Sequence, residues 1–401
     1  MIYLDNASTT FVDTTAIDII TNSLKDDYFN PSSLYNMGKD KYSIIQECKK
    51  RIITNLGLTD PTNIYFTSGG CEGNNWIIKG CVAEYYRYYK NEGLIHNFSQ
   101  YIKKPHIITT SFEHHSVLNA CKQLEDLGLL KVTQLTPDPT TGIINPTNIL
   151  KYISNDNDDY QTILVSVMWV NNVLGTVQPI KEIGDLCKKH YIKFHTDAVQ
   201  AVGNIHINLS EYNIDFMTVS GHKFHSPKGI GFVYIKDKTY LQPLISGGGQ
   251  EYGIRAGTEN LPYIKAITYC FEKYNNVKNI NSKYLYIEKL KQILYDALLK
   301  EYKDCIIFTS SKGIGTLNIA FKNLISDMLV YNLGERGYMI SVGSACDNGN
   351  FEDSHVLTSV SYPSDYINGN IRITFNEYNT IEEINNFIKV LKEEVNKLRG
   401  Y

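Results

Sequence analysis

Short apolar runs rich in β-branched and aromatic residues alternate with segments of helical periodicity over the first two thirds of this 401-residue chain. Among the helical segments, Ile180–Lys189 places Ile183, Leu186 and Cys187 on one face. A strand, a helix and another strand, repeated in this way, are typical of an α/β domain around a mainly parallel sheet. We predict buried strands at Ile64–Thr67, His106–Thr109, Ile163–Met168, Phe194–Thr196, Phe216–Val219 and Gly231–Ile235.

The pattern changes after about residue 262, where long helical segments replace the alternation. An apolar stripe near the C-terminus predicts a helix that begins at a capping box formed by Thr380 and Glu383 and ends at Gly400. Polar stretches at Asn91–Lys104 and Ser154–Tyr160 are expected to be surface loops. We therefore expect two domains, a large α/β domain at residues 15–262 and a smaller α+β domain formed by residues 1–14 and 263–401.

Composition and charge exclude several classes of protein. With 39 Lys and Arg against 42 Asp and Glu, the net charge is −3, which gives no basic footprint for nucleic acid or an anionic membrane. The longest apolar run, Ile163–Val170, is far short of the ~20 residues that cross a bilayer, so we expect no membrane span. The N-terminal residues lack the basic and apolar regions of a signal peptide.

The eight cysteines are scattered, and none forms a C-x-x-C pair. The spacing signals of zinc and redox motifs are therefore missing, and we expect no metal site. Unclustered cysteines without a signal peptide favour a reducing compartment. We expect a cytoplasmic location, and an organelle stays open.

Three segments carry chemistry, and the most informative is Ser220–Gly231. It places Lys223 at a strand end, between Ser and His on one side and a Pro/Gly turn on the other. An amine held there, partly desolvated, suits Schiff-base chemistry. Most lysines are ordinary surface residues, so this segment alone leaves both interpretations open.

The other two segments also follow predicted strands. Asp197 could pair with a protonated pyridine nitrogen, or it could simply cap the next helix. The glycine turn at Thr67–Asn75 opens a helix whose free N–H groups could hold a phosphate, or it is a plain strand-to-helix turn. An amine, a carboxylate and a phosphate cradle at strand ends together fit one cofactor, an aldehyde-bearing pyridine phosphate.

With these motifs, the sequence resembles the NifS/IscS-type cysteine desulfurases of the class V aminotransferase family. The resemblance covers nearly the whole chain, and the order of its motifs is highly specific. It implies the fold-type I architecture of pyridoxal-phosphate enzymes, with a mainly parallel sheet of seven strands and a smaller α+β domain. The matching segments are Tyr3–Thr10, Asn30–Leu34, Glu113–Leu118, Asn171–Asn172, Phe194–Gly203, Ser220–Gly231, Gly247–Glu251, Arg255–Asn260, Gly343–Cys346 and Gly369–Arg372.

The resemblance implies a role for each matching residue around pyridoxal 5'-phosphate. Lys223 would form the Schiff base, Asp197 would pair with the pyridine nitrogen, and His114 would stack on the ring as a catalytic residue, with His115 the weaker candidate. The ring substituents would be contacted by Asn172 and Gln200. The phosphate would be held by Gly70, Cys71, Ser220 and His222.

The same resemblance implies the substrate site and the partners. Arg372, helped by Asn30 and Asn172, would bind the carboxylate of L-cysteine. Thr258 would reach the phosphate of a neighbouring subunit, which implies a homodimer. The sulfur acceptor would be another protein, such as an iron–sulfur scaffold or a sulfur carrier.

Cys346 is the expected sulfur nucleophile. The glycines and small polar residues around it predict an exposed loop, which suits a thiol that takes up sulfur as a persulfide and passes it on. The substrate would leave as L-alanine. The structural alternative for Cys346 is an exposed thiol without a role.

Two other functions stay open. One is a related enzyme, a selenocysteine lyase or a transaminase-like enzyme, although the Cys346 loop favours sulfur chemistry. The other is a catalytically weak scaffold or partner protein with the same fold, which departures from the usual family residues suggest. These departures include Cys71, Gly73, Trp169, Val173 and Ile254.

Overall fold

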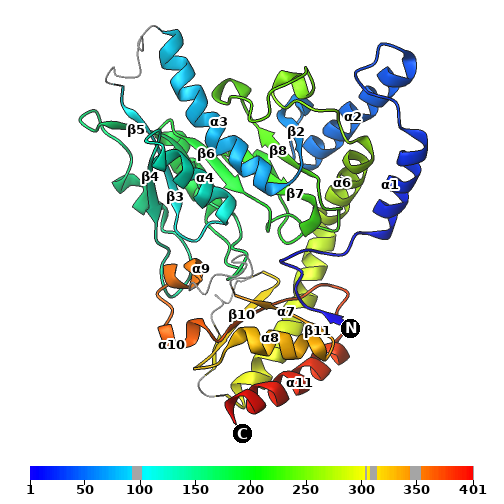
Figure 1. Cartoon of the computed structure of the whole chain (residues 1–401), viewed down its shortest axis with the longest axis vertical. Coiled ribbons are helices and arrows are strands. Elements are labelled where there is room, and N and C mark those ends of the chain that lie inside the picture. Colours follow the sequence, from blue (N-terminus) through cyan, green and yellow to red (C-terminus); the bar gives the residue numbers. More distant parts are fainter. Residues whose placement is uncertain (93–101, 303–304, 308–313, 344–353, 401) are drawn as a thin grey trace.

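The structure is a computed structural model that describes residues 1–92, 102–302, 305–307, 314–343 and 354–400. A larger sheet lies in the upper part of Figure 1 and a smaller one, with its helices, in the lower part. In the described ranges, the larger sheet has seven strands in the order β2-β8-β7-β6-β5-β3-β4. Their bounds are β2 Ile64–Thr67, β3 Lys104–Thr110, β4 Lys131–Leu135, β5 Tyr160–Ser166, β6 Lys193–Asp197, β7 Phe216–Ser220 and β8 Gly231–Ile235.

The larger sheet is mainly parallel, as predicted. Pairs β7–β6, β6–β5, β5–β3 and β3–β4 are parallel, whereas β8 runs antiparallel to both β7 and β2. Strands β2 and β7 therefore run in the same direction. All of these strands except β8 bring their carboxyl ends to one edge, where open α/β sheets bind ligands.

Helices cover both faces of this sheet. Side chains alternate between the faces along each strand, so neighbours such as Ile107 and Ile108 belong to different apolar clusters. One cluster joins the sheet to α2, α5 and α6, and the other joins it to α3 and α4. The bounds of the helices are α1 Thr14–Asp26, α2 Asn36–Asn55, α3 Gly70–Asn91, α4 His115–Asp126, α5 Ile180–Lys189 and α6 Leu261–Tyr274.

The smaller sheet has the order β12-β13-β10-β9 among the described residues, and all of its pairs are antiparallel. A separate apolar cluster packs it against α7, α8 and α11 and includes Leu4 from the N-terminus. The N-terminal strand β1 pairs in parallel with β11. The remaining bounds are β1 Ile2–Tyr3, α7 Val277–Leu299, β9 Cys305–Ile307, β10 Thr316–Phe321, α8 Ser326–Glu335, β11 Tyr338–Met339, β12 Ser341–Val342, α9 His355–Ser359, α10 Ser364–Ile367, β13 Asn370–Thr374 and α11 Ile381–Arg399.

The predicted strands are all present, β2 and β8 with the predicted bounds, and β3, β6 and β7 longer by one or two residues at one or both ends. Residues 93–101 of the predicted loop Asn91–Lys104 lie outside the described residues. Two differences are larger. The predicted strand Ile163–Met168 is β5, which begins three residues earlier and ends at Ser166, because the Met168 N–H bonds the Glu113 side chain. Strand β4 was missed. The capping box of α11 is confirmed, and Gly400 ends that helix with a left-handed φ of 79°. The domain boundary at residue 262 remains a prediction.

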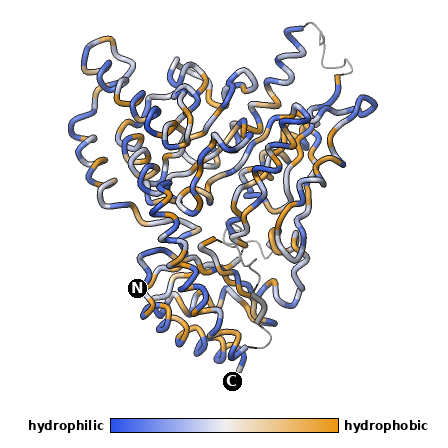
Figure 2. Tube along the Cα trace, turned by 180° about the vertical axis from the view of Figure 1, so that it is seen from behind, coloured by the Kyte–Doolittle hydropathy of each residue, from blue (hydrophilic) through white to orange (hydrophobic). Residues whose placement is uncertain are grey.

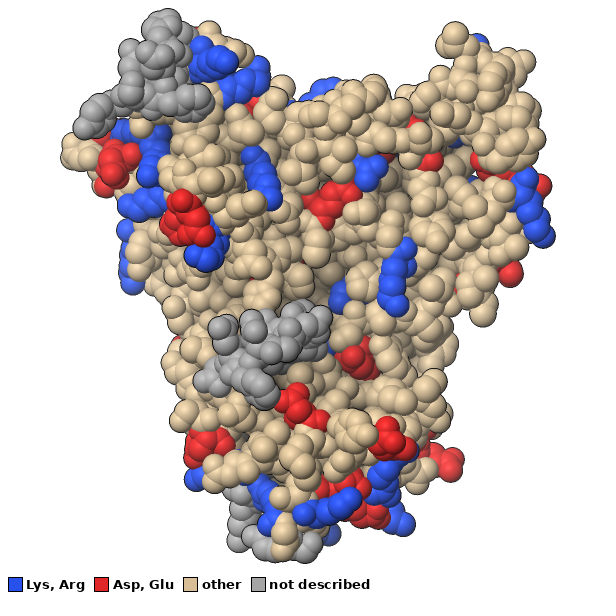
Figure 3. Space-filling view, viewed as in Figure 1, with Lys and Arg blue, Asp and Glu red and all other residues tan. Residues whose placement is uncertain are grey.

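Figure 2 shows apolar residues concentrated along the interior strands and hydrophilic residues along the outer turns of the helices. On the face drawn in Figure 3, acidic and basic side chains are interspersed. None of the described helices is both long enough and apolar enough to cross a membrane.

Candidate active site

Segments that follow the carboxyl ends of β2, β3, β5, β6 and β7 meet around a cavity of about 280 Å³. The N-terminal segment and β13 of the smaller sheet complete its wall. The predicted site residues that line this cavity are Gly70, Cys71, His114, Asn172, Asp197, Gln200, Ser220, His222, Lys223 and Arg372. The structure thus brings together side chains that lie up to about three hundred positions apart in the sequence.

The glycine turn before α3 is shaped for close approach. Gly69 has a φ of 150°, which disfavours any residue with a side chain. A Cβ on Gly70 would lie 2.8 Å from Val199 Cγ2, so a larger residue would not fit there. With glycine, the backbone itself forms this part of the cavity wall. Since α3 begins at Gly70, its free N–H groups and the positive end of its dipole lie at the cavity, which suits a phosphate.

Glu72 and Arg255 brace this turn from outside. One Glu72 oxygen accepts hydrogen bonds from Ser68 N at 2.7 Å, and the other accepts one from Arg255 Nε at 2.8 Å. Burial would raise the pKa of Glu72, but the bonds from Arg255 and Ser68 outweigh burial and hold that pKa below its usual value. An ionised Glu72 therefore fixes the turn in one conformation.

Lys223 lies at the end of the short 3₁₀ helix η4 (Gly221–Lys223), directly after β7. Its Nζ donates hydrogen bonds to the carbonyl oxygens of Ala7 at 2.6 Å and Ser8 at 2.8 Å. Gln200 Nε2 also donates to the Ala7 carbonyl, at 2.9 Å. The N-terminal segment thus holds the lysine amine inside the cavity.

Asp197 and His114 face the same cavity. Asp197 is buried, and it accepts hydrogen bonds from Asn74 Nδ2 at 2.7 Å and from Val199 N at 2.9 Å. Burial lowers the pKa of His114, partly offset by the charge of Asp197, so the neutral imidazole is favoured. Burial, followed by the charge of Lys223, lowers the pKa of His222 to about 4. The cavity therefore combines an amine, a carboxylate and neutral imidazoles.

Arg372 reaches the cavity from β13 and is almost fully buried. Its guanidinium donates to the Asn172 carbonyl at 3.0 Å, to Asp5 Oδ1 at 2.9 Å and to Ser8 Oγ at 2.7 Å. Arg372 Nε has no hydrogen-bond partner among the described residues. A planar donor set at the wall of a cavity suits a carboxylate ligand.

Two predicted site residues with described positions do not line this cavity. Thr258 is exposed in the loop before α6. Asn30 is also exposed, and its Oδ1 accepts a hydrogen bond from Ser32 N. Cys346 lies outside the described residues.

No role was predicted for the N-terminal residues Asp5, Ala7 and Ser8 or for Asn74 and Ser116. The first three contact Arg372 and Lys223, and the last two contact Asp197 and His114. Asp5, Ala7, Ser8 and Ser116 fall within segments that carry the family resemblance, and Asn74 lies in the glycine turn Thr67–Asn75. Their position in the sequence was the only sign that these residues belong to the site. Contacts made by backbone carbonyl groups cannot be recognised from the residue type.

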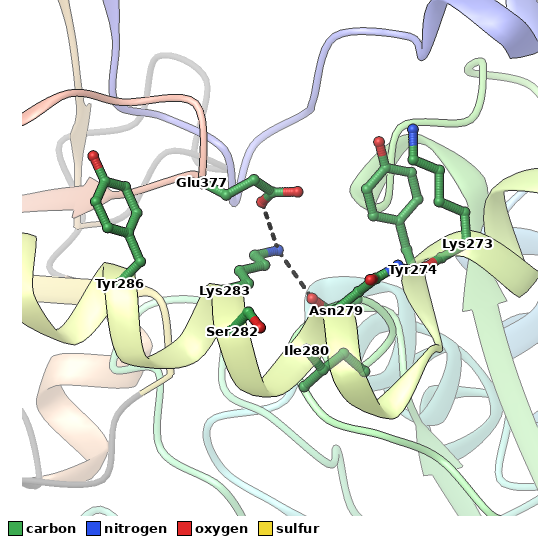
Figure 4. A pocket seen from close by; sticks show the side chains of 9 residues that line it. Lys273, Tyr274, Asn279, Ile280, Ser282, Lys283, Tyr286 and Glu377 are labelled. Atoms are coloured by element: carbon green, nitrogen blue, oxygen red, sulfur yellow. Dashed lines mark hydrogen bonds and ion pairs between the residues drawn. The ribbon is translucent and has the colours of Figure 1, made fainter.

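A second cavity, of about 460 Å³, lies between α6, α7 and the segment after β13 (Figure 4). Lys283 points toward Glu377, with 3.6 Å between Nζ and Oε2, and donates to the Gly203 carbonyl at 2.9 Å. Burial lowers the pKa of Lys283, opposed by the Glu377 charge. None of the predicted site residues with described positions lines this cavity.

The profile of the aminotransferase class-V family matches residues 2–387. The chain belongs to the class-V aminotransferase family. The match spans both sheets and the whole cavity, and it confirms both the resemblance and the predicted fold class.

Relatives and solved structures agree with this assignment. The chain is 37% identical to the cysteine desulfurase IscS of Methanosarcina thermophila over 401 residues, which cover 100% of this chain and 93% of the relative. A solved NifS-like protein superposes with a TM-score of 0.86 at 31% identity, covering 99% of this chain and 100% of the other. A structure of SspA in complex with cysteine gives a TM-score of 0.76 at 32% identity, covering 95% and 100%.

Proposed function

We propose that this protein is a cysteine desulfurase that converts L-cysteine to L-alanine and takes up the sulfur on Cys346. The observation that carries the proposal is the cavity itself. There the amine of Lys223, the carboxylate of Asp197 and the α3 turn lie together in a chain whose full-length relatives are named cysteine desulfurases. The cysteine found in the related SspA structure supports the choice of substrate.

The residues present fit pyridoxal 5'-phosphate. Gly70 leaves room at the α3 N-terminus where a Cβ would meet Val199, which suits a phosphate. Asp197 is a buried carboxyl group that lines the same cavity, which suits a protonated ring nitrogen. The further ligands proposed for the cofactor are Cys71, Ser220, His222, Asn172, Gln200 and His114.

When bound, the cofactor supplies an aldehyde for the substrate amine and an electron sink for the Cα carbanion. Arg372 would bind and orient the substrate carboxylate, with Asn172 beside it. The Lys223 amine, held between the Ala7 and Ser8 carbonyls, would take and return a proton at the substrate Cα. His114 would cover one side of the cavity and help to exclude water.

The Cys346 thiolate would attack the substrate sulfur, and the Cβ–S bond would break with its electron pair left on the substrate carbon. A persulfide then stands on Cys346, and the remaining carbon skeleton becomes L-alanine after protonation. The described residues that flank its segment support this role. Gly343 N bonds the Asn370 carbonyl on β13 at 3.2 Å, and His355 Nε2 lies 3.0 Å from the Glu113 carbonyl. Asn370 is two residues from Arg372, and Glu113 directly precedes His114. The residues on both sides of the Cys346 segment therefore contact positions next to site residues.

The proposal includes partners. Thr258, exposed and outside its own cavity, would contact the phosphate in a second subunit of a homodimer, and Asn30 would assist the substrate carboxylate after a local rearrangement. The persulfide would pass to an acceptor protein, such as a scaffold for iron–sulfur cluster assembly or a sulfur carrier. The described cysteines form no disulfide, which suits a reducing compartment such as the cytoplasm.

The test is a sulfur-release assay on purified protein loaded with pyridoxal phosphate. With an added thiol that reduces the persulfide and releases sulfide, L-cysteine should yield L-alanine in an amount equal to the sum of persulfide and sulfide. A parallel assay with L-selenocysteine tests the lyase alternative. Lys223→Ala should lose the yellow absorbance and the activity, whereas the exposed Lys228→Ala keeps both. Cys346→Ser should bind the cofactor without forming persulfide, and full sulfur transfer by that variant would contradict the proposal.

A further inference from the structure

Two polar residues connect Asp197 to His114. The Asn74 amide nitrogen lies 2.7 Å from Asp197 Oδ2 and 2.8 Å from Ser116 Oγ. Ser116 Oγ lies 2.8 Å from His114 Nδ1, and Ser116 N donates to the same nitrogen at 3.1 Å. An unbroken chain of hydrogen bonds thus runs from the carboxylate to the imidazole.

The direction of this chain is fixed by Asp197. An ionised carboxylate only accepts hydrogen bonds, so the amide NH₂ of Asn74 has to face it. In this orientation Asn74 Oδ1 is buried without a hydrogen-bond partner among the described residues. The opposite orientation would place Oδ1 against the Asp197 carboxylate and leave the buried NH₂ group without a partner, so the cost of an unpartnered buried group would remain. The second hydrogen of the NH₂ group then points to Ser116 Oγ, which accepts it.

Because Ser116 Oγ accepts from Asn74, its own hydrogen is available for His114 Nδ1. The backbone N–H of Ser116 also donates to Nδ1, because His114 is the N-cap of α4 and its side chain accepts this N–H. Two donors directed at one nitrogen require that nitrogen to carry its lone pair. In the neutral ring, the hydrogen then resides on Nε2.

We propose that Asn74 and Ser116 are positioning residues that hold His114 as its Nε2–H tautomer. The hydrogen bonds that run from Asp197 through these two residues thereby decide which ring nitrogen of His114 carries the hydrogen. The importance of this tautomer for the reaction rests on the proposed function, but the tautomer itself does not.

The surroundings of His114 favour the same neutral form. Burial and the positive charges of Lys223, His115 and His355 lower its pKa, while the charge of Asp197 opposes them. Donation from Ser116 to Nδ1 adds to the preference for the neutral ring, because a doubly protonated imidazole cannot accept it. Removing the Ser116 hydroxyl should therefore raise the pKa of His114.

The test is ¹⁵N NMR of histidine-labelled holoenzyme, with His114→Gln identifying the His114 signals. The wild-type ring should show an unprotonated Nδ1 and a protonated Nε2. In Ser116→Ala, the His114 pKa should rise by about 0.5–1 unit, because one hydrogen bond to the neutral ring is lost. Ser116→Thr keeps a hydroxyl and should restore the wild-type value, and the exposed Ser210→Ala should change nothing.

Asn74→Leu should shift the His114 pKa in the same direction as Ser116→Ala. A wild-type ring that carries its hydrogen on Nδ1 would overturn the proposal, as would an unchanged pKa and tautomer in Ser116→Ala. The readout is independent of turnover. A protein that fails the cysteine assay can therefore still confirm the tautomer, and an active enzyme can still refute it.

Discussion

Glu113 is a buried carboxylic acid that follows β3 and directly precedes His114 of the candidate active site. It is fully buried between β3 and α4, where Oε1 accepts hydrogen bonds from Thr110 Oγ1 at 2.7 Å and Met168 N at 2.9 Å. Oε2 has no hydrogen-bond partner among the described residues. Burial raises the pKa of Glu113 from 4.5 to about 8. At neutral pH the folded protein should therefore hold this carboxyl protonated.

The Glu113→Gln substitution tests this conclusion. Between the unfolded pKa of 4.5 and the folded pKa of about 8, unfolding releases a proton, so stability falls as the pH rises. The slope is about 1.4 kcal/mol per pH unit, or ~3 kcal/mol between about pH 5 and pH 7. The glutamine side chain keeps the Oε1 acceptor and does not titrate. Its NH₂ group takes the place of the protonated Oε2 of Glu113, which has no hydrogen-bond partner among the described residues either. The stability of the variant should escape this loss.

The assay compares melting temperatures of the two proteins across this pH range at one saturating cofactor concentration. The excess Tm of Glu113→Gln over wild type should widen by about 4 °C from pH 5 to pH 7, because an unfolding entropy of about 2.1 cal/mol/K per residue gives ~1.2 °C per kcal/mol for a chain of 401 residues. The exposed Glu182→Gln on α5 serves as the control, with a difference that stays constant. A constant difference for Glu113→Gln as well would refute the reasoning, because it would mean that the folded protein ionises Glu113.

Three further predictions concern packing and binding. Lys49 is buried in an ion pair with Glu251, so Lys49→Met should cost about 3–5 kcal/mol in denaturant unfolding, and adding Glu251→Gln should recover part of the loss. A Cβ on Gly73 would lie 2.6 Å from Thr218 Cγ2, so Gly73→Ala should lower the unfolding midpoint, since overpacking at about 1–3 kcal/mol exceeds the helix-propensity gain of ~1 kcal/mol. Arg372→Lys loses the planar donor pair, and kcat/KM for cysteine should fall about 10- to 100-fold, mainly through KM, as measured by steady-state kinetics.

Strands that are buried on both faces were the most predictable part of the fold. The bounds of β2 and β8 agree with the sequence-based prediction at both ends, because turn residues enclose a continuous apolar run. Strand β4 was missed because it is an edge strand that pairs with β3 alone. Its side chains, Lys131 and Gln134 among them, are mostly partly exposed and show neither a continuous apolar run nor a clear alternation.

The candidate site was predictable where a side chain follows a strand and carries its own chemistry, as Lys223 and Asp197 do. The contribution of the N-terminal segment was not, because the Ala7 and Ser8 carbonyls hold Lys223 across more than two hundred residues. Any residue type supplies a carbonyl oxygen, so only the folded chain reveals such a contact. Gly73 departs from the usual family residue at this position, and the structure explains why. The side chains of Thr218 and Val233 occupy the space that the Cβ of an alanine would need.

The Arg372–Asp5 pair has a consequence for selectivity. Asp5 already offsets part of the charge of Arg372, so a ligand that offers only a carboxylate should bind at this wall more weakly than at an unpaired guanidinium. An amino acid has a second binding group, its amine, which the aldehyde of the proposed cofactor would bind beside Lys223. Discrimination would then rest on two simultaneous points of attachment, and simple carboxylic acids should inhibit the protein only weakly.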